Sequence, residues 1–169
     1  STTAFDKTRA GTFLETLKAT YRGAVLTMML DLGHRHGLFE ALSKGPATSA
    51  ELARRTGLSE RHVREWLGAV TVAGVTGYDA PTGVFTLPTE HGFWLTGNRY
   101  TNMAPMSGML TGLGQRIDDV AETFTSGSGV PYENYRPHFT CAMDVLGRAK
   151  YDALLVPVYL PKITGLVDR

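Results

Sequence analysis

The residues of this 169-residue chain that could hold a metal ion or attack a substrate are few and scattered. No two histidines are four positions apart, and only one cysteine is present, so the sequence offers neither a helical histidine pair nor a cysteine cluster. We therefore predict no metal site. We also predict that Cys141, with no activating base nearby in the sequence, is a buried and inert thiol. The histidines are His34, His36, His62, His91 and His138.

Two tyrosines, Tyr132 and Tyr135, lie in a loop of sequence VPYENYRP that is bracketed by prolines and preceded by a Ser/Gly joint. Their hydroxyl groups and flat rings could cover a bound ligand, as loops beside a flexible joint often do. They could equally fasten the loop to the core. The residues alone leave both interpretations open.

Residues 47–73 have the pattern of a helix-turn-helix, and they organise the chain around them. Thr48 or Ser49 can cap a first helix, Gly57 can end it, and Ser59 can cap a second helix. Apolar residues then recur at three- and four-residue spacing, which is typical of one buried helical face. Two short β-prone runs, 75–78 and 84–87, flank a turn cluster and predict a wing.

A winged helix raises the question of DNA binding, for which Arg61, His62 and Arg64 on the second helix are the candidate base-reading residues. However, residues 47–99 contain five arginines and five acids, and a specific DNA-binding surface is normally basic. The net charge of the whole chain is only +1. We therefore predict that the winged helix packs against other elements and does not read DNA, and nucleic acid is an unexpected partner.

The remaining elements are predicted to be helical. Helical periodicity or helix-favouring residues span 12–35, 38–42, 89–95, 102–124, 138–150 and 151–160. We expect Phe93, Trp94 and Leu95 to pack inward, a break near residues 33–37, and Pro157 to kink or end the last helix. Apolar residues make up 43% of the chain, which is enough for a sizeable core. The longest apolar runs are too short to cross a bilayer and no signal-peptide pattern is present, so we expect a cytoplasmic protein without membrane contact.

Three stretches together resemble a known family. They read LDLGHRHGLFEALSKGPATSAELARRTGLSERHVREWLGAVTVAGV, then GVFTLPTEHGFWLT, then GVPYENY. This combination is similar to the N-terminal portion of bacterial class I S-adenosylmethionine-dependent methyltransferases, in which a winged-helix-like domain precedes a Rossmann-like catalytic domain. The resemblance covers nearly the whole chain, from about residue 14 to residue 167.

The resemblance implies a mainly α-helical fold, with residues 1–100 forming N-terminal helices and a winged helix. Residues 101–169 would form a helical lid that leads to the catalytic domain. It also implies a homodimer whose parent enzyme methylates a small molecule, with Tyr132, Tyr135 and His34 around the substrate. The acidic, glycine-rich loop that holds S-adenosylmethionine in the family has no counterpart here and would begin shortly after Arg169, so this chain alone should be inactive. A winged-helix transcription regulator and a purely structural dimerisation module are the other functions considered.

Overall fold

A computed structural model describes residues 4–163 and residue 165. It begins with a 29-residue helix, α1 (Lys7–Arg35), that starts five residues before the predicted boundary. The earlier start is due to Asp6, whose carboxylate accepts hydrogen bonds from the backbone N–H groups of Thr8 and Arg9 and so caps the helix. The predicted break is confirmed: α1 ends at Arg35, and Gly37 has a φ of 65°, which glycine adopts at little cost.

The helix-turn-helix is confirmed, preceded by the short helix α2 (Leu38–Ser43). Its first helix, α3 (Ser49–Thr56), is capped by Thr48 through a reciprocal capping box with Glu51, and it ends at Gly57 in the left-handed conformation. Its second helix, α4 (Glu60–Val72), follows Ser59, whose side chain makes no capping hydrogen bond. The predicted apolar face of α4 is buried, apart from Ala73, which lies just after the helix and is exposed.

The main core lies where α1, α2, α3 and α4 meet. Phe39 and Trp66 are its largest rings, with centroids 5.2 Å apart in an edge-to-face arrangement. The indole N–H of Trp66 donates to the carbonyl of Met29 at 2.8 Å, which ties α4 to α1. The buried apolar residues of this cluster are Leu38, Phe39, Ala41, Leu42, Ala47, Leu52, Ala53, Val63, Trp66, Leu67, Val70 and Leu87.

The wing is a two-stranded antiparallel hairpin of β1 (Gly77–Asp79) and β2 (Val84–Thr86), in which Tyr78 is paired with Phe85. The helix α5 (Thr89–Leu95) follows with the predicted bounds. The prediction that Phe93 and Trp94 pack inward is wrong, because these side chains are 39% and 52% exposed. The prediction holds for Leu95, which is half-buried against the core, and the fully buried residue of this helix is Gly92, which lies against Leu87.

The long helix predicted over residues 102–124 is in fact two helices, α6 (Ala104–Gly114) and α7 (Ile117–Ser126). Glycines at 108, 112 and 114 weaken the first helix, each by about 1 kcal/mol relative to alanine. Asp118 and Asp119 then favour a new N-terminus, because acids in a first turn interact well with the helix dipole. The predicted apolar stripe is therefore interrupted, and Ile117 and Phe124 are 64% and 88% exposed.

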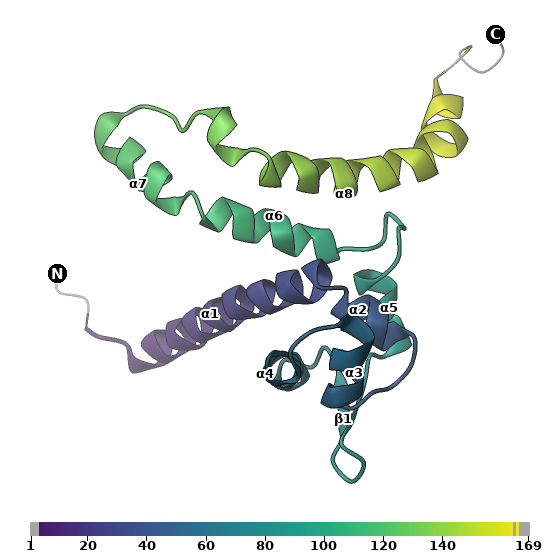
Figure 1. The fold of residues 1–169 in the computed structure, drawn as a ribbon. Coiled ribbons are helices and arrows are strands. Elements are labelled where there is room, and N and C mark those ends of the chain that lie inside the picture. The colour runs from purple at the N-terminus through teal and green to yellow at the C-terminus, as the bar shows by residue number, and fades with distance from the viewer. Residues whose placement is uncertain (1–3, 164, 166–169) are drawn as a thin grey trace.

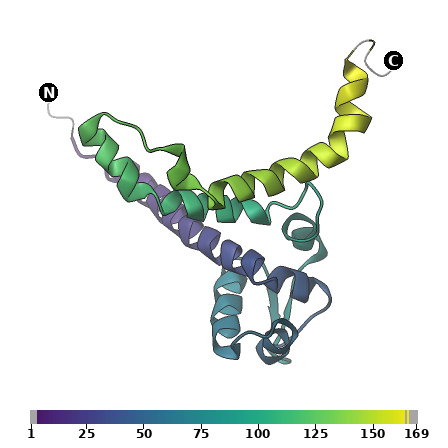
Figure 2. The same ribbon diagram turned by 45° about the horizontal axis from the view of Figure 1, so that its top comes forward.

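The second half of the molecule is a helical hairpin laid over α1. A short 3-10 turn, η1 (Tyr132–Tyr135), precedes α8 (His138–Leu154), and the turns η2 (Leu155–Tyr159) and η3 (Leu160–Lys162) follow it. The regular helix stops three residues before Pro157, as predicted from that proline. The helix α6 lies between α1 and α8, while the winged helix sits at the C-terminal end of α1 (Figures 1 and 2). No helix in the described part of the chain is long and apolar enough to cross a membrane.

Candidate functional site

A groove of about 340 Å³ opens where the winged domain meets α8. One wall is formed by His34 at the end of α1 and by the segment 97–105 that leads into α6, and α8 forms the other wall. The groove therefore contains one of the predicted site residues, His34. We call it the α8 groove. Its lining side chains include His34, Arg99, Tyr100, Asn102, Asp144, Val145, Arg148 and Asp152.

The α8 wall of this groove carries three charges in a row, one helical turn apart. The guanidinium Nη2 of Arg148 lies 2.9 Å from both carboxylate oxygens of Asp144. The hydrogen bonds and charge of Asp144, together with the charge of Asp152 on the next turn, raise the pKa of Arg148 above its ordinary value. Arg148 is thus paired with Asp144, whereas Asp152 makes no salt bridge within the described residues.

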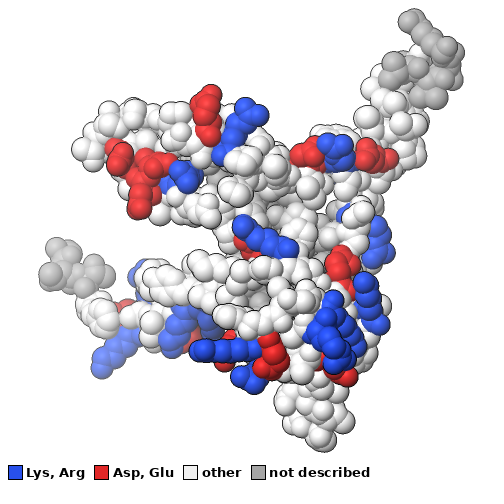
Figure 3. All heavy atoms as spheres, viewed as in Figure 1, with Lys and Arg blue, Asp and Glu red and all other residues white. Residues whose placement is uncertain are grey.

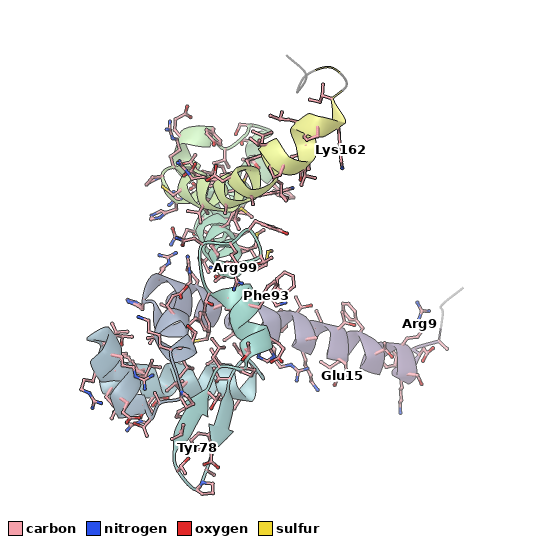
Figure 4. All side chains as sticks on the ribbon, turned by 90° about the vertical axis from the view of Figure 1, so that its right-hand side faces the viewer. Arg9, Glu15, Tyr78, Phe93, Arg99 and Lys162 are labelled. Carbon is pink, nitrogen blue, oxygen red and sulfur yellow. The ribbon has the colours of Figure 1, made fainter. Side chains whose placement is uncertain are left out.

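The opposite wall presents Arg99. Its guanidinium carbon lies 5.0 Å from the centroid of the Phe93 ring, which is within the range of a cation–π contact. Figure 4 shows these two side chains next to each other at the junction of the winged domain and the helical hairpin. Within the described residues Arg99 makes no salt bridge. Sequence reasoning missed Arg99, counting it only in the charge balance, although the neighbouring Phe93, Trp94 and Tyr100 were a signal.

A buried polar cluster beneath His34 fixes α1 against α6. The Asp31 carboxylate accepts hydrogen bonds from the Arg35 guanidinium at 2.7 Å and from the Thr111 hydroxyl at 2.6 Å. Burial alone would raise the pKa of Asp31, but the two hydrogen bonds together with the nearby charges of Arg35 and His34 outweigh burial and hold the pKa below its ordinary value. Gly108 leaves room for this carboxylate, since a Cβ there would lie 3.0 Å from its Oδ1 atom. The position of His34 at the groove is thus determined by a rigid contact between two helices.

The predicted tyrosines lie apart from the α8 groove. Tyr132 is 56% exposed, and Tyr135 is half-buried with its ring centroid 6.1 Å from that of Phe139. Neither ring lines the groove that contains His34. The prediction that Cys141 is buried is wrong, because its thiol is exposed. Helical spacing did not show that Cys141 borders a hollow between α8 and the helices α1 and α6, where it stays accessible to solvent.

The candidate DNA-reading residues Arg61, His62 and Arg64 are all exposed on α4. Arg64 lies 3.3 Å from the Glu60 carboxylate, which in turn accepts a hydrogen bond from the Ser49 hydroxyl at 2.7 Å. In Figure 3, positive and negative side chains are interspersed over the visible face of the winged domain. No basic face gathers on this side. Among the described residues, no group of three or more His, Cys, Asp or Glu side chains could hold a metal ion.

Residues 24–97 match the family model of the Rv2258c-like winged HTH domain, and this part of the chain has the fold of a winged helix-turn-helix. A comparison with curated proteins finds no match. Among solved structures, the mitomycin 7-O-methyltransferase MmcR aligns with a TM-score of 0.64 and 17% identity, covering 86% of this chain and 46% of that one. RosA from Streptomyces davawensis, an N,N-8-amino-8-demethyl-D-riboflavin dimethyltransferase, aligns with a TM-score of 0.65 and 20% identity, covering 83% and 44%.

PigF, solved with SAH, aligns with a TM-score of 0.60 and 14% identity, covering 89% of this chain and 48% of that one. At these identities the similarity establishes the fold. The chain spans less than half the length of these structures and corresponds to their N-terminal half.

Proposed function

We propose that this chain is the N-terminal dimerisation and substrate-covering domain of an S-adenosylmethionine-dependent methyltransferase that acts on a small molecule. The observation that carries the proposal is the agreement of fold. Between 83% and 89% of the chain aligns with RosA, MmcR and PigF, which extends well beyond the winged helix itself. A winged helix alone occurs in many settings, whereas this extended arrangement of helices is found in the methyltransferase structures.

Within the described residues, no Rossmann-type site for the methyl donor is formed. The described strands, β1 and β2, form only the wing, and no glycine-rich loop joins a strand to a helix there. S-adenosylmethionine supplies an activated methyl group when bound, and in this proposal a separate catalytic domain holds it. The part played by residues 1–169 is to orient the acceptor molecule and exclude water, and orientation can account for much of the rate of such a transfer.

Dimerisation is supported by α1, whose first five turns are almost entirely exposed. Phe13, Tyr21, Val25 and Met28 are between 54% and 65% exposed although all are large and apolar. A continuous apolar surface of this kind marks an interaction site. In this proposal residues 1–100 supply the dimer contact, and residues 101–169 supply the lid.

Sedimentation tests the dimer contact. We expect the chain to sediment as a dimer, and we expect Tyr21→Glu to yield monomer because it places a charge on the apolar stripe. Thr20→Glu is the matched control, since Thr20 is also exposed but its hydroxyl bonds to the Thr16 carbonyl within the helix. A monomeric parent chain at high concentration would refute the dimer.

The lid assignment concerns Tyr132, Tyr135 and His34. Their proposed role is to position the substrate and exclude water without transferring a proton. Tyr132→Phe and Tyr135→Phe, made in the complete gene product, should raise KM for the acceptor or weaken cofactor binding. Unchanged kinetics in both variants would refute the lid assignment.

The enzyme class is tested by titrating S-adenosylmethionine, in a calorimeter, into the complete gene product and into the 169-residue chain. We expect binding by the first and none by the second. If the complete gene product does not bind the cofactor, the proposed function is wrong, whatever the oligomeric state.

A further inference from the structure

The α8 groove adjoins a second hollow of about 570 Å³. The two hollows have five lining residues in common, which come from the segment 97–103 on one side and from α8 on the other. The shared residues are Asn98, Arg99, Tyr100, Ala149 and Asp152. They therefore define one continuous depression with Arg99 and Asp152 on opposite walls. Each hollow is large enough for a molecule of drug-fragment size or above.

The charges at this centre are opposite but do not meet. Arg99 and Asp152 form no salt bridge with each other, so no nitrogen of Arg99 lies within 4.0 Å of an Asp152 carboxylate oxygen. Asp144 is already bound by Arg148, as described above. Arg99 and Asp152 are both exposed and carry opposite charges on facing walls, so a ligand with a charged group at each end can pair with both of them.

The wall around Arg99 is aromatic. Phe93 and Tyr100 line the depression and are 39% and 49% exposed, and Trp94 packs edge-to-face against Phe93 at a centroid distance of 5.1 Å. The guanidinium of Arg99 lies over the ring of Phe93, and a guanidinium in such a position can still donate N–H hydrogen bonds to an anion. Rings that are half-exposed inside a hollow offer flat surfaces on which another ring can stack.

We propose that this depression binds a small aromatic molecule with an anionic group at Arg99 and a cationic group at Asp152. A carboxylate is the anion that best fits the planar guanidinium, since the two groups can form paired hydrogen bonds. An ammonium group fits Asp152. The aromatic body of the ligand lies between them, against Phe93 and Tyr100.

As a statement about the acceptor of a methyltransferase, this inference rests on the proposed function. As a statement about a binding site, it concerns only residues of this chain. The following experiment therefore uses the 169-residue chain and needs neither the methyl donor nor catalysis.

Separate probes test the two charged ends of the proposed ligand, so the experiment does not need a molecule whose charged groups are spaced to match Arg99 and Asp152. Benzoate tests Arg99, and benzylamine tests Asp152. Two-dimensional NMR of the ¹⁵N-labelled chain follows the indole N–H of Trp94, which neighbours the site, with the indole of Trp66, bonded to the Met29 carbonyl, as an internal reference. We expect both probes to shift the Trp94 signal in a saturable way and to leave the Trp66 signal unchanged.

Variants identify the contact of each probe. Arg99→Gln should weaken benzoate binding about tenfold or more and leave benzylamine unaffected, and Asp152→Asn should do the reverse, because hydrogen bonds to charged groups are of that strength. Arg61→Gln and Asp118→Asn are the matched controls, since both are exposed and lie outside the depression. Acetate should bind more weakly than benzoate.

Three results would overturn the inference: no saturable binding of either probe, equal loss in the control variants, or equal affinity for acetate and benzoate. None of these results bears on whether the complete gene product binds S-adenosylmethionine. Conversely, a gene product that fails to bind the cofactor would leave the depression as a binding site whose ligand is not a methyl acceptor.

Discussion

Gly33→Ala is the substitution whose effect on stability the structure predicts most directly. Gly33 lies in the last turns of α1, where alanine would ordinarily be favoured over glycine. Yet a Cβ at this position would lie 2.5 Å from Cε2 of Phe39 and 2.6 Å from Cζ2 of Trp66. Carbon atoms normally approach to about 3.5–4.0 Å, so both rings, or the backbone of α1, must move by about 1 Å.

Neither ring can move freely. Phe39 and Trp66 are only 1% and 5% exposed, and the indole is held by its hydrogen bond to Met29. Overpacking of this kind costs about 1–3 kcal/mol, and loss of the indole hydrogen bond would add about 1 kcal/mol. The higher helix propensity of alanine offsets at most about 1 kcal/mol of this cost. We therefore expect the free energy of unfolding to fall by about 1–3 kcal/mol.

Urea unfolding, followed by circular dichroism, measures this change. Gly68→Ala is the matched control, because Gly68 lies in α4, near Trp66 in sequence, and a Cβ there would meet nothing within 4 Å. It should stabilise the chain by up to about 1 kcal/mol, so the two substitutions should change the free energy of unfolding in opposite directions. Adding Phe39→Leu should reduce the cost of Gly33→Ala, since it removes the ring edge that the new methyl group meets. A Gly33→Ala chain as stable as the parent would refute this account of the core.

Three further outcomes are expected. Thr48→Ala should lower the free energy of unfolding by about 1 kcal/mol in thermal denaturation, and Ser59→Ala by clearly less, because only Thr48 makes a side-chain capping bond; equal losses would contradict this assignment. The lowered pKa of Asp31 means that its ionised form stabilises the fold at neutral pH and that this contribution disappears as pH falls through the folded-state pKa. Asp31→Asn should therefore cost about 1–3 kcal/mol in urea unfolding at pH 7 and progressively less below about pH 4, whereas a difference independent of pH would exclude ionisation as its cause. In gel-shift assays across a salt series the chain should show no sequence-preferring binding of DNA, and a steep salt dependence would instead support the winged-helix regulator.

The winged helix could be predicted from the sequence because its signals are local. The capping box of Thr48 and Glu51, the left-handed Gly57 and the turn of the wing each depend on a few adjacent residues. The burial of α4 followed from periodicity alone, since Val63, Trp66, Leu67 and Val70 recur on one helical face.

The helical hairpin was harder to predict because an apolar period does not show where a helix is interrupted. The spacing from Met103 to Phe124 fits one helix, yet the glycines near residue 114 and the acids that follow them divide it. Periodicity also does not reveal which face is covered within this chain. Phe93, Trp94 and much of the α1 stripe are apolar at helical spacing and are nevertheless exposed.

The candidate site could not be predicted from local sequence patterns either, because its residues are far apart in the sequence. His34, Arg99 and Asp152 are separated by more than fifty residues from one another in sequence, and they meet only because α6 lies between α1 and α8. Within that layering, the buried Asp31 carboxylate links α1 to α6 through the hydrogen bond from Thr111, and Arg35 holds the carboxylate on α1. A change at Asp31 should therefore disturb the α8 groove without touching any of its charged residues. If the Asp31→Asn chain bound benzoate and benzylamine as the parent does, the groove would be set by α8 and the segment 97–103 alone, independently of this clamp.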